Sequence, residues 1–140
     1  MKGSAIVTGR RGEFMVIGKL LEKGFTVYTP VADVEGIDCI IRNEKGRLIQ
    51  IQIKTRTKNQ EEGKYFIVKE FRPSYDFFIC CYLIDTDELW VIPSHIFHDL
   101  AYYDKKVKDW TLPMSVKNQK ELFNYKDDYG LKLLKKGNGK

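Results

Sequence analysis

The feature that most constrains the fold is residues 76–84, which read Asp-Phe-Phe-Ile-Cys-Cys-Tyr-Leu-Ile. After its first residue this stretch is apolar without a break, and it is too short to cross a membrane as a helix. A strand with one wet face alternates polar and apolar residues, whereas a strand covered on both faces reads as a continuous apolar run. We therefore expect residues 76–84 to form a strand of a sheet that has other elements packed on both faces.

Segments on either side of this run supply further elements. Apolar residues recur at helical spacing over residues 13–23, and Gly24 follows where a helix C-cap belongs, so we expect a helix there. Residues 37–42 and 48–55 are rich in β-branched residues and are typical of two strands joined in a hairpin. We also expect strands at 25–29, 65–68 and 89–92, a short helix from 93 to about 103, and a helical tail over 116–134 that Gly130 weakens.

This order of elements, one helix, then mostly strands, then helices, predicts a domain of the α/β class, mixed α+β in character, with one central sheet. At 140 residues the chain is long enough to bury a core and too short for two ordinary domains, so we expect a single domain over residues 1–140. Its content of 43% hydrophobic and 13% aromatic residues excludes a disordered chain.

The charge of the chain is distributed in blocks. Residues 1–44 are neutral overall, whereas residues 45–72 carry eight basic and three acidic side chains. Residues 73–104 then carry six acidic side chains and no Lys or Arg, and residues 105–140 carry ten basic and four acidic ones. Two basic blocks therefore flank an acidic block. This pattern is typical of a surface that attracts a polyanion such as nucleic acid, although a solvated lysine-rich surface explains it equally well.

The cysteines and the N-terminus indicate the compartment. Cys39, Cys80 and Cys81 are odd in number, and the last two would point to opposite faces of a strand, so they do not make a disulfide framework. The N-terminus lacks the apolar run of a signal peptide, and no stretch is long enough to span a membrane. We expect a cytoplasmic protein with reduced thiols and no membrane partner.

Two acidic residues lie where apolar ones are expected. Glu13 heads the helix face that also carries Val16, Ile17 and Leu20. It is either a solvated acid in the first turn or a half-buried acid that needs a partner. Asp38 lies among β-branched residues although Asp is a poor strand former. It is either a turn acid at the strand entrance or a functional carboxylate.

The loop length of the hairpin decides whether Asp38 has polar neighbours. With a three-residue loop that ends at Gly46 in a positive φ, Asp38 opposes Gln52 and both side chains point to one face. Lys54 lies on that face two residues along. A two-residue loop would pair Asp38 with Ile53 and scatter the polar groups. Only the longer loop therefore gathers an acid, an amide and a lysine.

In this order, Glu13, Gly36-Ile37-Asp38, a glycine-containing hairpin and Gln52-Ile53-Lys54 resemble the motifs of the PD-(D/E)xK nuclease superfamily. They are most similar to its Q-x-K variants, which include small homing-endonuclease-like domains, and they also resemble Holliday-junction-resolvase-like domains, which keep a glutamate. The resemblance covers residues 9–57, and the C-terminal strand pair and helices over 76–136 would complete the domain. It implies a restriction-endonuclease-like core, with a central mixed sheet flanked by helices.

The resemblance also implies a function, the metal-dependent endonucleolytic hydrolysis of phosphodiester bonds in duplex or branched DNA. The catalytic residues would be Glu13, Asp38, Gln52 and Lys54. Mg²⁺, or Mn²⁺ in its place, would be bound by Asp38, Gln52, Glu13 and the backbone carbonyl of Ile53. Lys54 would orient or help to deprotonate the attacking water and stabilise the charge that develops at phosphorus.

DNA, the implied partner, would be contacted by residues near this face. Arg10 and Arg11 are expected to precede the N-terminus of the first helix, which itself offers backbone donors to phosphate. Thr55, Arg56 and Lys58 are expected to leave the motif strand as a basic, hydroxyl-rich loop suited to backbone contacts. For each of these cations, plain solvation is the alternative.

Two questions stay open from the sequence. Such sites cut one strand each, so we expect a homodimer or higher homo-oligomer, with self-association through residues 73–104 and the apolar strand 77–84. Gln52 carries no charge, and Ile37 stands where the superfamily has proline. These departures leave open a catalytically inactive relative that binds DNA or a protein, and the site chemistry also leaves open a nuclease that acts on RNA.

Overall fold

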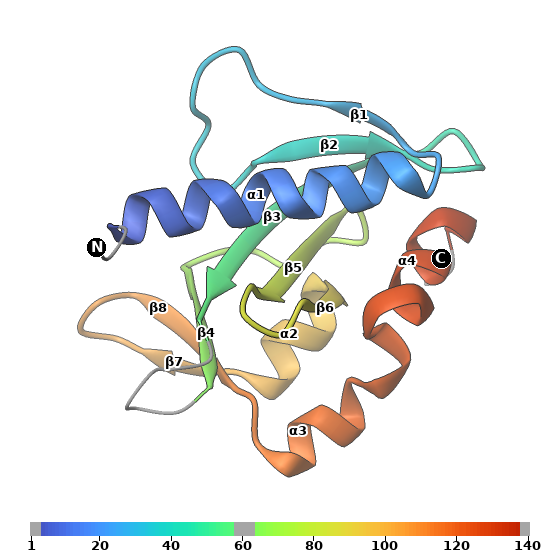
Figure 1. Ribbon diagram of the computed structural model, residues 1–140. Coiled ribbons are helices and arrows are strands. Elements are labelled where there is room, and N and C mark those ends of the chain that lie inside the picture. The colour runs from blue at the N-terminus through green and yellow to red at the C-terminus, as the bar shows by residue number, and fades with distance from the viewer. Residues whose placement is uncertain (1–3, 58–63, 138–140) are drawn as a thin grey trace.

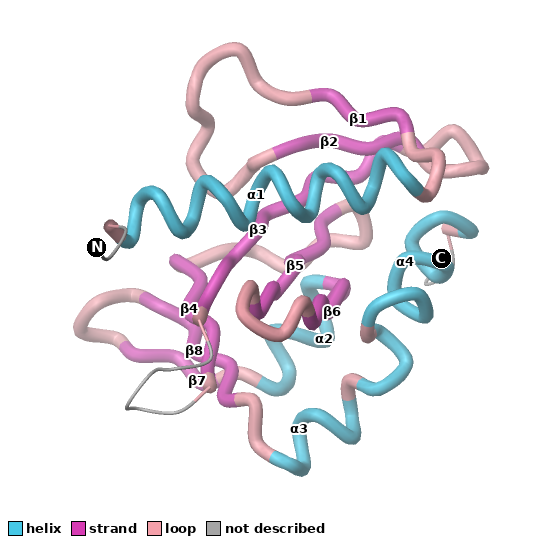
Figure 2. The backbone as a smooth tube through the Cα atoms, viewed as in Figure 1, coloured by secondary structure: helices cyan, strands magenta, loops and turns pink. Residues whose placement is uncertain are grey.

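The protein is built around a five-stranded mixed sheet with further layers on both faces (Figure 1, Figure 2). The computed structural model describes residues 4–57 and 64–137. The strand order is β1-β2-β3-β5-β6, in which β3 and β5 are parallel and the other neighbours are antiparallel. The strands are β1 (Thr26–Tyr28), β2 (Cys39–Arg42), β3 (Leu48–Arg56), β5 (Phe77–Leu83) and β6 (Glu88–Pro93). The predicted mixed α/β class with a central sheet flanked by helices is confirmed.

The strand β5 is covered on both faces, as its apolar run predicts. All seven of its residues are buried. Phe78 and Tyr82 point into a core shared with α1 and α4, whereas Ile79 and Leu83 point into a second core on the opposite face. The helices and strands that complete these two layers are α1 (Ala5–Glu22), α4 (Asp127–Lys136), α2 (Ser94–Leu100), α3 (Val116–Glu121), β4 (Tyr65–Lys69), β7 (Tyr102–Asp104) and β8 (Asp109–Pro113).

A second, three-stranded antiparallel sheet of order β4-β8-β7 covers the face of the main sheet that lies opposite α1 (Figure 1). Phe66 of β4 and Leu112 of β8 are fully buried in the second core. Of the three strands, the sequence patterns predict β4 alone. The predicted helix from 93 to about 103 is therefore too long, because it ends at Leu100 and the chain continues into β7.

The first helix is also longer than predicted. It begins at Ala5, where the Ser4 hydroxyl accepts a hydrogen bond from the helix backbone, and not at residue 13, where the apolar pattern begins. Arg10 and Arg11 therefore lie within α1 and do not precede its N-terminus, so the expectation that they flank a phosphate-binding helix end is wrong. Glu13 lies in the middle of α1, which removes the interpretation of this residue as a first-turn acid.

The C-terminal tail is not one helix over 116–134. It divides into α3, a 3₁₀ turn (Phe123–Tyr125) and α4. The break falls at Lys126, whose extended backbone pairs with Trp90 of β6, and at Asp127, whose carboxylate accepts a 2.9 Å hydrogen bond from the Leu89 backbone. The tail is thus bent by its contacts with the edge of the main sheet.

The hairpin between β2 and β3 has the register that its three-residue loop predicts. Cys39 pairs with Ile51, and the same register carried one residue further sets Asp38 against Gln52. Gly46 has a φ of 79°, as the loop requires. Asn43 fixes the loop, because its side-chain oxygen accepts the backbone N–H groups of residues 45 and 47, each at 3.0 Å.

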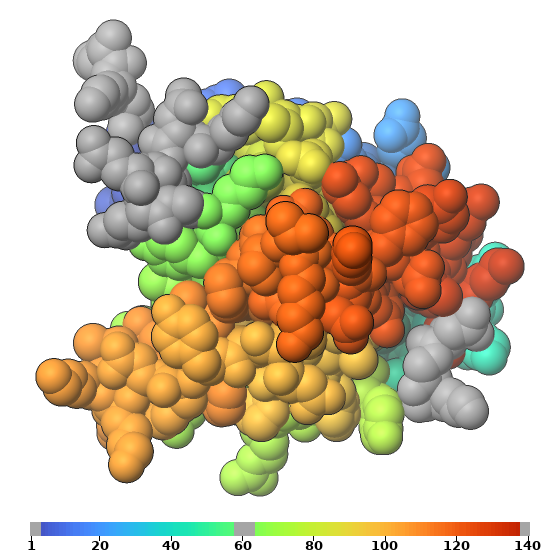
Figure 3. All heavy atoms as spheres, turned by 90° about the horizontal axis from the view of Figure 1, so that it is seen from below, coloured from blue at the N-terminus to red at the C-terminus, as the bar shows by residue number. Residues whose placement is uncertain are grey.

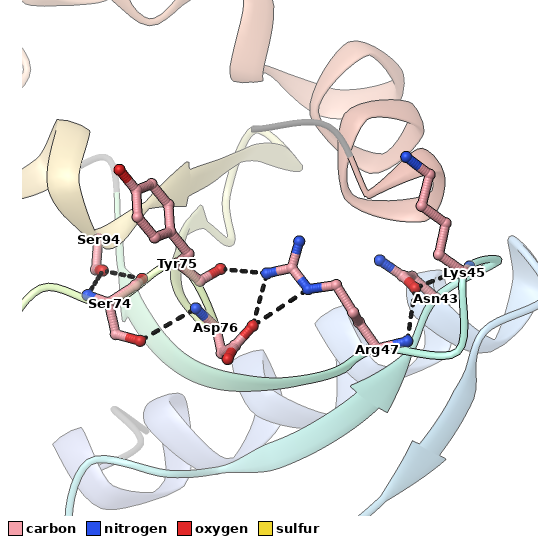
Figure 4. Close-up of polar contacts among 7 residues, drawn as sticks. All are labelled: Asn43, Lys45, Arg47, Ser74, Tyr75, Asp76 and Ser94. Carbon is pink, nitrogen blue, oxygen red and sulfur yellow. Dashed lines mark hydrogen bonds and ion pairs between the residues drawn. The ribbon is translucent and has the colours of Figure 1, made fainter. Parts of the chain in front are cut away.

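Arg47 ties this hairpin to the beginning of β5 (Figure 4). Its guanidinium donates to the Asp76 carboxylate at 2.6 and 3.2 Å and to the Tyr75 carbonyl at 2.8 Å. Ser74 and Ser94 exchange hydrogen bonds next to this contact and join the same loop to α2. These contacts join the residue before β3 to the residues before β5, and so support the parallel pairing of the two strands.

The environment of β5 corrects one expectation about assembly. Because β5 is buried on both faces and hydrogen-bonded to β3 and β6 on its two edges, the strand 77–84 is not available for self-association. The three cysteines are free, as expected, and all three are buried. Within residues 4–57 and 64–137, no helix is long and apolar enough to cross a membrane.

Candidate active site

Asp38 lies where β2 begins and is held by the strand that it faces. Its backbone N–H donates to the Ile51 carbonyl at 2.8 Å, which extends the hairpin ladder by one residue. Its carboxylate oxygen Oδ2 accepts a 2.6 Å hydrogen bond from the backbone N–H of Ile53. The main chain of β3 therefore fixes one carboxylate oxygen and orients the other.

Gln52 and Lys54 follow on β3, on the face that Asp38 shares by register. Gln52 is 7% exposed although it is polar, and Lys54 is half-buried. The parallel partner β5 sets Gln52 beside Ile79 and Lys54 beside Cys81, both of which point into the second core. Gln52 is therefore not a solvent-facing residue of this strand, and it lines a pocket together with Asp38 and Lys54.

Glu13 reaches the site from α1, on the other side of β3. The helix comes this close because Gly12 has no side chain, since a Cβ at this position would overlap the Thr55 hydroxyl. Arg10, one turn before Glu13, donates to the Glu13 carboxylate at 3.4 Å. The Glu13 side chain is 27% exposed and has Arg10 as its partner. It therefore matches the sequence interpretation of a half-buried acid that needs a partner.

One open pocket of about 840 Å³ brings these groups together. Its lining includes Glu13, Asp38, Gln52, Ile53 and Lys54, so the structure assembles all five residues that the resemblance assigned to chemistry.

The pocket holds two carboxylates whose negative charge is only partly offset by the neighbouring cations. Burial raises the pKa of Glu13, the Asp38 charge raises it further, and Arg10 and Lys54 lower it. Burial also raises the pKa of Asp38, against the opposing effects of the Ile53 N–H and of Lys54. Asp38 is thus close enough to Glu13 to disfavour the ionisation of Glu13, an effect that a bound cation would oppose.

The donor set of the pocket suits a hard divalent cation. In the part of the chain that the structure describes, no three His, Cys, Asp or Glu side chains converge, so two carboxylates would have to be completed by neutral oxygens. The Gln52 amide and the Ile53 carbonyl are oxygens of this kind in the same pocket. Mg²⁺ is commonly held by one or two carboxylates and keeps several waters, so this set of oxygen donors fits it.

Of the residues expected to contact DNA, some are exposed, whereas others are buried or already have a partner within the protein. Arg11 is exposed on α1, whereas Arg10 is engaged by Glu13. The Thr55 hydroxyl is buried against Gly12 and faces away from solvent. The Arg56 guanidinium stacks on the ring of Tyr65 at 3.9 Å. Lys58 lies outside the described residues.

The pocket also has lining residues that sequence reasoning did not find. They come from the end of β4 and the segment after it, and from the turn between β7 and β8, and they include Lys69, Glu70, Arg72 and Lys108. No local motif marks them, because they reach the pocket only through the second sheet. The basic charge of the blocks 45–72 and 105–140 was the one signal that pointed to them.

A comparison with protein families finds that the PD-(D/E)XK endonuclease family matches residues 6–132, a range that contains every residue of the proposed catalytic set. No protein of curated function matches the chain.

Among solved structures, the chain is similar to a bacterial homing endonuclease, I-Ssp6803I, with a TM-score of 0.65 and 23% identity over 99% of this chain and 96% of that one. It is also similar to D212, a nuclease from a fusselovirus, with a TM-score of 0.53 and 17% identity over 98% of this chain and 96% of that one. At these identities the likeness shows the fold, which is the restriction-endonuclease-like core.

Proposed function

The chain belongs to the PD-(D/E)XK endonuclease family, and from this premise we propose that it is a metal-dependent endonuclease that hydrolyses phosphodiester bonds in duplex or branched DNA. The observation that carries the proposal is the convergence of Glu13, Asp38, Gln52 and Lys54 in one pocket. We further propose that residues 1–140 act as a single nuclease domain in the cytoplasm.

The proposed metal ligands are the Asp38 and Glu13 carboxylates, the Gln52 side-chain oxygen and the Ile53 carbonyl. Mg²⁺ is the proposed ion, with Mn²⁺ as a substitute. The ion would polarise the phosphate and lower the pKa of a water in the site. Asp38 is the principal ligand in this proposal, because the Ile53 N–H already holds one of its oxygens and so directs the other.

The Lys54 ammonium is proposed to act on the phosphate and on the attacking water. It is half-buried in the same pocket and lowers the pKa of both Asp38 and Glu13, so its charge reaches the region between them. From there it would orient the water and stabilise the negative charge that grows on the phosphate oxygens. Its strand position beside β5 keeps it in place without a loop movement.

The geometry reduces the number of residues in α1 and β3 that we propose as DNA contacts. Arg11 remains a proposed DNA contact, together with Lys58. Arg56 is less suited to this role, because its Nε and Nη2 atoms are buried and its guanidinium stacks on the ring of Tyr65. Arg10 is better explained as the partner of Glu13, to which its guanidinium donates. Thr55 is better explained as a packing residue, since its hydroxyl is buried.

The test is incubation of the purified protein with supercoiled plasmid, four-way junction and flap DNA, with Mg²⁺, Mn²⁺ or a chelator. We expect cutting that requires the divalent ion and that falls by about 10²-fold or more in Asp38→Asn and in Lys54→Ala. Glu44→Gln and Lys45→Ala, exposed at the tip of the β2–β3 hairpin, are the matched controls and should cut like the wild type. The proposal fails if none of the substrates is cut, or if Asp38→Asn retains full cutting.

A second candidate function is a catalytically inactive relative that binds DNA or a protein. The observation that favours it is Gln52, a buried neutral residue of the pocket, in a place where a charged ligand would hold a cation more tightly. A titration with Mn²⁺ separates the two candidates. Binding that Asp38→Asn abolishes supports the nuclease, whereas DNA binding that depends on salt but not on metal supports the inactive module. The same cutting assay with RNA substrates tests whether the enzyme acts on DNA alone.

A further inference from the structure

The charges that line the active-site pocket are separated by element. Glu13, Glu35 and Asp38 line it from α1 and from the segment that leads into β2. Across β3, the lining comes from the second sheet and carries the cations Lys69, Arg72 and Lys108, which we call the basic wall. Lys54 lies on the strand between the two sides.

The basic wall is formed where the two basic blocks of the sequence meet. Lys69 ends β4 in the first block, and Lys108 ends the β7–β8 turn in the second. The Glu70 backbone N–H donates to the Lys108 carbonyl at 2.9 Å, so the two segments are joined directly beside the pocket. The acidic block that separates them in sequence does not separate them in space.

The turn that presents Lys108 is ordered and has an unusual residue choice. Asp104 closes it, since the Lys108 N–H donates to the Asp104 carbonyl at 2.8 Å and the Lys106 N–H donates to the Asp104 carboxylate at 2.9 Å. Lys108 has a φ of 58°, a left-handed conformation that favours glycine or asparagine over lysine. A lysine at this position is explained if its side chain has a function there.

The cations of this wall are available to a ligand. All three are exposed, and none forms an ion pair within 4.0 Å with another residue that the structure describes. The one acid among them, Glu70, accepts a 3.0 Å hydrogen bond from the Tyr103 hydroxyl of β7. In Figure 1 the β7–β8 turn and the N-terminal half of α1 lie on the same side of the molecule, with the C-terminal end of β3 between them, and in Figure 3 this turn projects from the edge of the molecule.

We propose that Lys69, Arg72 and Lys108 bind backbone phosphates of the nucleic acid substrate, across the pocket from Asp38 and Glu13. This inference rests on the proposed function. An acidic wall repels a phosphate until a cation is bound, whereas the opposite basic wall attracts one without it. The substrate backbone is therefore drawn to the second sheet first and laid along the pocket with one phosphodiester facing Asp38. These contacts carry no sequence information, so they position the substrate rather than select it.

The experiment measures DNA binding in a chelator, where no cutting occurs, as a function of salt concentration. The probe is a fluorescent 30-base-pair duplex of arbitrary sequence. The triple variant Lys69→Ala, Arg72→Ala, Lys108→Gly removes the wall, and glycine at position 108 keeps the left-handed φ without strain. The matched control Lys117→Ala, Lys132→Ala, Lys136→Ala removes the same charge from exposed positions on α3 and α4.

Each lost phosphate contact should make the slope of log K against log salt less steep by about 0.9. We expect the slope of log K against log salt to be less steep by about 2 to 3 in the triple variant, equally for duplexes of different sequence. The control should keep the wild-type slope. Equal slopes for the triple variant and the control, with a wild type that binds, overturn the inference and leave the proposed function intact. A wild type that binds no DNA at all overturns both.

Thermal unfolding of each variant accompanies the binding curves. If the triple variant unfolds at a lower temperature than the assay requires, the single variant Lys108→Gly decides the question. It should relieve backbone strain, so that it is at least as stable as the wild type, and still reduce the slope by about 1. An unchanged slope in a folded Lys108→Gly variant overturns the role of Lys108.

Discussion

Asp38 combines two requirements that conflict in an isolated protein. To bind a cation, Asp38 must be ionised, yet burial raises its pKa. The neighbouring Glu13 is a second acid whose pKa is also raised by burial. The Ile53 N–H and Lys54 oppose this rise but do not remove it. The site is therefore less stable than a neutral pocket would be, and it becomes favourable when a cation joins it.

This conflict predicts how stability depends on pH. Because the folded-state pKa of each acid is raised, the folded protein binds these protons more tightly than the unfolded chain does. Stability should fall as pH rises from near the ordinary values, 3.8 for Asp38 and 4.5 for Glu13, through the raised values, and stay lower above them. We expect Glu13→Gln and Asp38→Asn to have a higher Tm than the wild type at pH 7 and the same Tm below about pH 3.5.

The measurement is thermal unfolding of these variants across this pH range, with the exposed Glu44→Gln as the control. Addition of Mn²⁺ should raise the Tm of the wild type and should not raise that of Asp38→Asn. When the ion is at a hundredfold its Kd, the free energy of unfolding of the wild type should increase by about 2.7 kcal/mol. A Glu13→Gln variant that is less stable than the wild type at pH 7 would contradict the prediction.

Among the residues of the site, those on the hairpin and Glu13 could be predicted from the sequence, whereas the basic residues of the second sheet could not. The pairing of Asp38 with Gln52 follows from counting along a loop whose length Gly46 defines, and such counting uses local sequence alone. That Glu13 belongs to the middle of a helix depends on a cap at Ser4, which lies outside the apolar pattern. Lys108 reaches the pocket through pairing between strands, for which the sequence carries no local signal.

The contact between α1 and β3 depends on one small residue. Gly12 is buried against Thr55, whereas Gly18 of the same helix has nothing within 4 Å of the place where a Cβ would be. The helix supplies Glu13 at the residue after this contact, so the separation of α1 and β3 sets the distance between Glu13 and the acid of the hairpin.

We expect Gly12→Ala to push α1 away from β3, to cost about 1–3 kcal/mol of stability and to reduce cutting even in the folded protein. Gly18→Ala is the control and should stabilise α1 by about 0.5–1 kcal/mol without an effect on cutting. Unfolding in urea and the plasmid assay measure the two effects. Wild-type activity in a folded Gly12→Ala variant would show that the position of Glu13 is not set by this contact.

The strands that the sequence missed have a physical reason in common. The β7–β8 turn has no Gly, Asn or Pro at its tip and reverses instead with Lys108 in a left-handed conformation, so the usual turn signal is absent. Tyr102 and Tyr103 then read as the end of the preceding helix. By contrast, the apolar run of β5 is a signal of burial on both faces that needs no knowledge of the neighbouring elements.

The charge blocks take on a definite arrangement in the folded molecule. Three acids of the acidic block are paired with bases from other blocks, Asp76 with Arg47, Asp87 with Lys19 and Glu88 with Lys126, at 2.6 to 2.9 Å. The basic blocks meet beside the candidate active-site pocket through residues 70 and 108. The pocket lining carries four acidic and four basic side chains, so the separation of these charges between two sides, and not the total of +5, is what the fold adds.

One pocket with one proposed catalytic set lies in the described part of the chain, and this limits what one molecule can do to a duplex. A single set hydrolyses one phosphodiester at a time, so a double-strand break needs a second subunit or a second binding event. We expect supercoiled plasmid to become open-circular DNA at the lowest protein concentrations. Linear DNA should appear only later or at concentrations where the protein forms a dimer or higher oligomer.

Agarose gels of a cutting time course, run beside light scattering at the same concentrations, measure the two quantities together. If self-association supplies the second site, the rate of linearisation should rise more steeply with protein concentration than the rate of nicking. Asp38→Asn mixed in excess with the wild type should then suppress linear DNA before it suppresses nicks, because mixed oligomers keep one working pocket. Linear DNA formed without an open-circular intermediate by a protein that scatters as a monomer would contradict the assignment of one cut to one pocket.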